Sequence, residues 1–151
     1  MFSRKNSVLL MFAVLLPLGC GSEANFDDEA LDKMAGGKRQ ETVAVSGKVT
    51  VGGVPTGNIV IYGYTQASGL KPAAETHTKA DGTYCWNTYT DCDGVPPGEY
   101  KLTFAHIPNE RKGKKQGEDL LKGQYKDPAK SEFSLVVTSG APQADVNYDL
   151  K

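Results

Sequence analysis

The chain has 151 residues, and its 17 glycines and 8 prolines favour many turns over long helices. Its formal net charge is −1, with 18 acidic against 17 basic residues. Proteins that bind nucleic acids usually carry a basic face, so this balance argues against a nucleic-acid partner. The composition indicates one small, turn-rich globular domain.

The first residues have the pattern of an export signal. Arg4 and Lys5 form a charged start, and Val8–Leu18 is an apolar run of eleven residues, too short to span a bilayer comfortably. The following Leu-Gly-Cys, which ends at Cys20, resembles the processing site of bacterial lipoproteins, although Pro17 stands where that pattern usually has leucine.

The resemblance implies a signal peptide over residues 1–19 and a lipid anchor on Cys20, which would carry acyl chains such as palmitate. Three acyl chains on one cysteine give stable anchoring, so we expect a protein held in a bacterial membrane, on the periplasmic or surface side. An ordinary secretory signal cleaved nearby and a retained anchor are the alternatives, and each also exports the domain to the cell envelope.

Two cysteines remain, Cys85 and Cys92. Export implies an oxidising compartment, where an even pair usually forms a disulfide, so we expect these two residues to be bonded. A metal pair is the alternative, but a seven-residue spacing with no nearby histidine is a poor zinc signature.

Residues 20–41 are predicted to be a lipidated tether, because they carry several acidic residues and end in Gly36-Gly37-Lys38-Arg39-Gln40. We expect a disordered spacer that holds the domain off the membrane. The alternative is a short helix capped by Asn25 and stopped by Gly36, which folds on a partner, since a helix of this length is marginal alone.

Alternation of apolar and polar residues begins at Thr42. It predicts seven strands, over 42–51, 58–64, 75–79, 83–89, 98–106, 133–137 and 146–150. Asp81-Gly82 is typical of a hairpin turn, and Gly47 in mid-strand indicates a bulge or a close backbone approach. Segment 107–131 interrupts the pattern as a long, lysine-rich loop. Seven strands without a long helix favour an all-β sandwich over residues 42–151.

Three segments carry a family resemblance: Val45–Ile61, Lys79–Tyr84 and Val95–Phe104. They resemble the carboxypeptidase regulatory-like domain, a transthyretin-like (prealbumin-like) module, here in a free-standing bacterial lipoprotein. The resemblance implies a seven-stranded Greek-key β-sandwich without catalytic activity of its own. Within it, we expect the phenol of Tyr100 to reach a backbone partner from the edge of the core.

The chain offers little for catalysis. His77 and His106 are its two histidines, and nothing in their spacing indicates a metal site, while no Gly-x-Ser-x-Gly motif is present. Asp91-Cys92-Asp93-Gly94 resembles part of a calcium loop but lacks the remaining ligands, so turn chemistry is favoured. We expect no enzyme, no metal and no cofactor. A small metal- or histidine-dependent enzyme stays as the third alternative and requires the two histidines to converge.

The sequence therefore predicts a lipid-anchored envelope protein with a non-catalytic binding or structural module. Loops at the ends of the sandwich are the expected recognition surface for an envelope protein or polysaccharide. The candidate residues in these loops are Asp91, Asp93, Arg111, Lys112, Lys114 and Lys115. A carbohydrate-binding module is the second alternative; exposed coplanar aromatic side chains would favour it, and a buried Trp86 would count against it.

Overall fold

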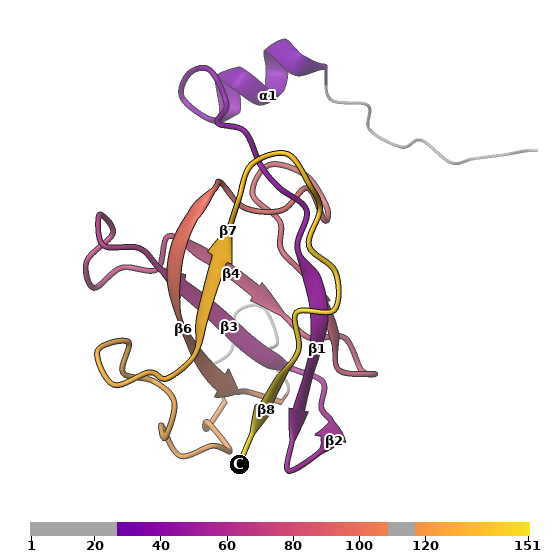
Figure 1. The fold of residues 1–151 in the computed structure, drawn as a ribbon, viewed down its shortest axis with the longest axis vertical. Helices are drawn as coiled ribbons and strands as arrows, with labels where there is room; N and C mark the ends of the chain where they lie inside the picture. The colour runs from indigo at the N-terminus through magenta and orange to yellow at the C-terminus, as the bar shows by residue number, and fades with distance from the viewer. Residues whose placement is uncertain (1–26, 109–116) are drawn as a thin grey trace, which may run out of the picture.

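The computed structural model describes residues 27–108 and 117–151, which form two β-sheets and one short helix (Figure 1). The elements are α1 (Asp28–Met34), β1 (Ser46–Val51), β2 (Val54–Pro55), β3 (Ile59–Tyr64), β4 (Ala74–His77), β5 (Thr83–Cys85), β6 (Gly98–His106), β7 (Ser134–Val137) and β8 (Tyr148–Leu150). This is the all-β, two-sheet architecture expected from the alternating pattern. The described residues form eight strands, because Val54–Pro55, expected as turn, pairs with β1.

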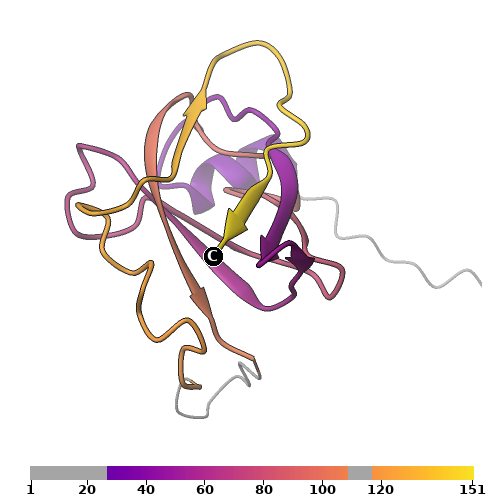
Figure 2. The ribbon, with the colours of Figure 1, turned by 60° about the horizontal axis from the view of Figure 1, so that its bottom comes forward.

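The first sheet is built around β1. Strands β2 and β5 pair antiparallel along one side of β1, and the last strand, β8, pairs parallel along the other. Figure 2 shows β8, in yellow, lying beside β1, in indigo. Before β1 the chain makes only isolated bridges at Val43 and Val45, which explains why β1 starts at Ser46 and not at Thr42.

The second sheet is antiparallel throughout, in the order β4-β3-β6-β7. Strand β6 occupies residues 98–106, as the alternation predicts. Its neighbours are set by the pairing of Phe104 with Ile61 on β3 and of Tyr100 with Leu135 on β7. Since side chains alternate along a strand, these residues face the core, and their neighbours face outward.

The core lies between the two sheets. Its fully buried members include Val49, Ile59, Ile61, Leu102, Phe104 and Leu150. Tyr84 and Trp86 also point inward, with 3% and 1% of their surface exposed. Phe133 and Tyr148 pack on this core as a cluster with Phe104, at ring-centroid distances of 5.1 to 5.9 Å.

Two glycines behave as close-contact residues. A Cβ on Gly47 would lie 1.9 Å from the carbonyl oxygen of Val146, so this position needs glycine for close backbone approach. Gly82 has a φ of +77° and donates its N–H to Lys79, closing the expected turn. The turn is not a hairpin within one sheet, however, because β4 pairs with β3 and β5 pairs with β1.

The described part of the return segment, residues 117–133, runs along β6. The N–H of Leu120 donates to His106, the N–H of Phe104 donates to Tyr125, and the N–H of Leu102 donates to Phe133. Strand β7 pairs with residues 98–101 of β6, and these bonds extend the backbone pairing along the same side of β6 as far as His106. This part of the expected long loop is therefore tied to the sheet.

Residues 27–41 contain helix α1, which is the short helix given above as the alternative to a disordered spacer. Its N-cap is Asp27, whose side chain accepts from the N–H of Ala30 at 2.8 Å; Asn25, the predicted cap, lies outside the described residues. After the helix, Arg39 donates to Asp28 and Asp32, and its guanidinium lies 5.9 Å from the ring centre of Tyr89. These contacts place α1 at one end of the sandwich (Figure 1).

Candidate functional site

The predicted disulfide between Cys85 and Cys92 is present. Their Cα atoms lie 5.3 Å apart, within the ordinary range for a disulfide. The bond ties the end of β5 to the loop that follows, so the alternative of a metal pair does not describe these two cysteines. Strand β5 ends at Cys85, earlier than the expected residue 89, because the loop after Trp86 has its own bonding pattern.

Asp93 organises that loop. Its carboxylate accepts three backbone N–H groups, from Thr88 at 2.7 Å, Tyr89 at 2.9 Å and Thr90 at 3.1 Å. Asp93 was expected as a recognition residue, but its acceptor oxygens are occupied within its own loop. Asp91 is exposed, and in the described part of the chain it makes no hydrogen bond or ion pair that would hold its carboxylate in place.

Several other predicted site residues lie outside the described residues: Cys20, Arg111, Lys112, Lys114 and Lys115. Across residues 27–108 and 117–151, no group of three or more His, Cys, Asp or Glu side chains is arranged to hold a metal ion. No helix within those ranges is both long and apolar enough to cross a membrane.

The two histidines lie close in the sheet but on opposite faces. His77 on β4 pairs with Val60, and His106 on β6 pairs with Ile59. Paired residues share a face, and consecutive residues of β3 face opposite ways, so the two imidazoles point away from each other. The convergence that an enzyme would require of these two residues is not formed.

Trp86 is a core residue. It is 1% exposed and packs edge-on against Tyr84, at a ring-centroid distance of 6.4 Å. Its indole N–H is buried and has no acceptor among the described residues. A side chain in this position cannot stack on a sugar, which removes the main support for the carbohydrate-binding alternative.

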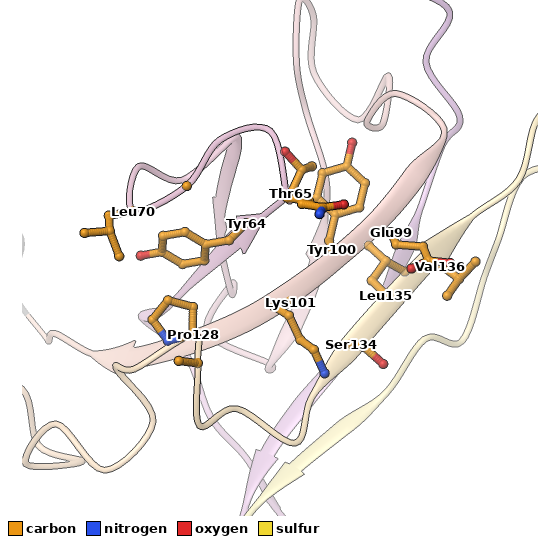
Figure 3. Close-up of a pocket in the computed structure, with 13 residues that line it drawn as sticks. Tyr64, Thr65, Leu70, Glu99, Tyr100, Lys101, Pro128, Ser134, Leu135 and Val136 are labelled. Carbon is orange, nitrogen blue, oxygen red and sulfur yellow. The ribbon is translucent and has the colours of Figure 1, made fainter.

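A concave surface lies on the outer face of the second sheet. It is a hollow of about 650 Å³, bounded by Tyr64 and Leu70 on one side, Pro128 on another, and Val136 on β7. Figure 3 shows the side chain of Lys101 at its centre, with Tyr64, Leu70 and Pro128 around it and Glu99 and Val136 beyond. We call these six residues the β6 face.

The strand register explains this arrangement. Lys101 on β6 lies opposite Tyr64 on β3 and opposite Ser134 on β7. Glu99 lies opposite Val136 on the same face. Since the cross-strand neighbours of both charges are uncharged, neither charge has an ion partner on the sheet; the ion pairs of the described residues involve Arg39 and Lys130 instead.

The free edge of β7 is closed by side chains. The phenol of Tyr148 donates to the carbonyl of Ser134 at 3.2 Å, and the side-chain amide of Gln143 donates to the carbonyl of Val136 at 3.1 Å. Burial raises the pKa of Tyr148 to about 12, so its hydroxyl keeps the proton that it donates. An incoming strand would have to displace both bonds to pair with this edge.

Tyr100 fixes the start of β6 beside the hollow. Its phenol donates to the carbonyl of Pro96 at 2.7 Å, which confirms the expected backbone partner. Burial raises the pKa of this hydroxyl, because the phenolate would be poorly solvated there. The bond holds Pro96–Gly98 against the strand and so fixes the position of Glu99.

Comparison with family models and with the sequences of curated proteins gives no match for this chain. The resemblance to the carboxypeptidase regulatory-like domain therefore rests on the motifs in the sequence. The two sheets show an all-β architecture, which many unrelated functions share.

The β6 face is not visible in the sequence pattern. Its parts come from residues 64–70, 99–101, 128 and 136, which are distant in the chain and meet only through the order β3-β6-β7. One local signal was available: Val136 and Leu70 are large apolar residues at positions that the pattern assigns to solvent. They are 54% and 91% exposed.

Proposed function

We propose that this chain is an exported, lipid-anchored protein of the bacterial cell envelope whose non-catalytic β-sandwich is a binding or structural module. The finer assignment belongs to the same proposal: cleavage of residues 1–19, acylation of Cys20, and a seven-stranded Greek-key sandwich of the carboxypeptidase regulatory-like family. The motif segments support that assignment, since they fall on β1–β3, on the turn before β5 and on the start of β6.

The observation that carries the proposal is the β6 face. It is concave, it exposes Leu70 and Val136, and it carries charges of both signs without ion partners among the described residues. A concave surface lined by apolar side chains with a few polar groups is the usual form of a ligand or partner site.

The roles of the acidic residues support a module that binds and does not catalyse. Asp93, Asp119 and Asp149 all accept backbone N–H groups, so their carboxylates serve the fold. His77 and His106 face opposite sides of the second sheet. Among the six residues of the β6 face, the acid and the base are Glu99 and Lys101, which are two residues apart on β6.

The anchor would set the orientation of this face. The seven-residue step from Cys20 to Asp27 spans at most about 25 Å, whatever its conformation. The α1 end of the sandwich would then lie near the membrane, and β6, which runs along the long axis, would present its face sideways (Figure 1). A partner in the same membrane could therefore reach it.

Site-specific photocrosslinking in cells tests this proposal. A photoreactive amino acid replaces Leu70 in the full-length chain, and the matched control replaces Val54, which is 64% exposed on β2 of the other sheet. We expect a discrete adduct from position 70 and little from position 54. Equal adducts from both positions, or none from position 70, would contradict a binding role for the β6 face.

A further inference from the structure

We infer that the β6 face is self-complementary and docks a second copy of this chain. The inference rests on the proposed function, since it names the partner of the same surface. Three features of the structure carry it: the placement of two opposite charges on one strand, the apolar residues beside them, and the closed edge of β7.

The first feature is a pair of opposite charges on β6. Glu99 and Lys101 are two residues apart on β6 and therefore point from the same face of the sheet. Both are exposed, and neither forms an ion pair within residues 27–108 and 117–151. A single strand thus presents an acid and a base in sequence, with Tyr64, Ser134 and Val136 as their uncharged neighbours.

Such a pair complements itself across a two-fold axis. A two-fold interface brings residue i of one copy to residue j of the other, and j to i. If the axis lies midway between two facing sheets, perpendicular to β6 and level with Tyr100, the two β6 strands run antiparallel. Glu99 of each copy then lies against Lys101 of the other, which gives two equivalent ion pairs.

The apolar residues favour the same contact. Leu70 and Val136 flank the charges on opposite sides of the hollow, with 91% and 54% of their surface exposed. The loop that carries Leu70 projects from the sandwich (Figure 1). A second copy that covers the β6 face would remove both side chains from water, and apolar burial is the main driving force for association.

Other occupants fit less well. Strand addition at β7 meets the bonds from Tyr148 and Gln143 to its outward carbonyls. A polyanionic glycan would meet the carboxylate of Glu99 at the centre of the face, and Tyr64 is the one aromatic side chain of the hollow that could stack on a sugar. A face-to-face contact uses both charges and both apolar residues.

Anchoring would assist the contact. Two copies held in one membrane by their lipid chains meet at a much higher effective concentration than two free copies. A modest interface is then sufficient, which fits a face that holds only two charges and a few apolar side chains.

Charge exchange in cells tests the inference. Two full-length chains with different tags are expressed together, fixed chemically, and recovered through one tag, and the amount of the other tag is measured. E99K and K101E should each lower this amount by about tenfold, because every ion pair becomes a like-charge contact. The double variant E99K/K101E should restore the amount found for the original chain.

A mixed experiment makes the test sharper. When one chain carries E99K and the other K101E, all contacts across the axis are again between opposite charges, so the mixed pair should be recovered while each variant alone is not. Single variants that are recovered like the original chain, or a double variant as weak as the single ones, would overturn the inference, as would no recovery of the second tag from the original chain. An adduct from position 70 with a different protein would overturn it too, but would leave the proposed function standing.

Discussion

Replacement of Asp93 by alanine should destabilise the domain more than is usual for a substitution in an exposed loop. The carboxylate accepts N–H groups from Thr88, Tyr89 and Thr90, and the substitution would leave all three without this partner. A net value of about 1 kcal/mol for each hydrogen bond gives about 3 kcal/mol. Since the bonds are partly exposed, water compensates for part of the lost hydrogen bonding, and we expect the free energy of unfolding to fall by about 2 kcal/mol.

Urea unfolding followed by tryptophan fluorescence measures this loss. Trp86 is the one tryptophan of the chain and is buried beside the loop, so its fluorescence reports on unfolding there. With a slope of about 1.5 kcal/mol per molar urea, the midpoint should fall by about 1.3 M. Asp91→Ala is the matched control, since Asp91 lies in the same loop and is exposed; its midpoint should hardly change. If the two variants unfold at the same urea concentration, the three bonds to Asp93 do not stabilise the loop.

Three further substitutions have expected outcomes in the same assay. Gly47→Ala should cost about 3 kcal/mol or prevent folding, because its Cβ would meet the Val146 carbonyl at 1.9 Å; a neutral result would refute that contact. Tyr100→Phe should cost about 1 kcal/mol through the lost bond to Pro96, and an unchanged midpoint would argue against it. Bonds from the Thr50 hydroxyl and the Gly53 N–H lower the pKa of Asp149 below 3.8, so its contribution to stability is present above that pH and is lost as the pH falls through the lowered pKa. Asp149→Asn should therefore lose less stability than the original chain between pH 7 and pH 3, and identical pH profiles would contradict this.

The sequence predicts best where a pattern is local. Strand β6 occupies 98–106 as expected, because the turn at Pro96–Gly98, the alternation of Tyr100, Leu102 and Phe104, and the phenol bond to Pro96 all act within ten residues. The disulfide was predicted from the number of cysteines and the expected export, and it is present in the structure. The role of Gly47 as a close-contact residue was also visible in its place within a strand.

The sequence pattern does not show the contacts that a side chain makes with the folded backbone. Asp93 was placed on a recognition surface, but it bonds to the backbone of its own loop, and that loop ends β5 at Cys85. For the segment before β1, a disordered spacer was expected with a short helix as the alternative; the helix is present, and Arg39 bonds to Asp28 and Asp32 beside it. Each case depends on the fit between a carboxylate and donors that are arranged by the folded backbone.

The β6 face could not be found from the chain alone for a different reason. It depends on which strands are neighbours, since Tyr64, Lys101 and Ser134 form one cross-strand row only in the order β3-β6-β7. Alternation assigns each of these residues to the outer face but does not say which strand lies beside which. The charges at positions 99 and 101 therefore read as ordinary solvent-facing residues until the register is known.

One crosslinking experiment tests the lipid anchor and the β6 face together. The photoreactive residue at position 70 is compared in the original chain and in a Cys20→Ser variant, with position 54 as the control in both. We expect an adduct from position 70 that falls sharply when Cys20 is replaced, because the released chain loses its effective concentration at the membrane. An adduct that is equally strong from position 54 would contradict the account of the β6 face. One from position 70 that is unchanged by Cys20→Ser would contradict the account of the lipid anchor.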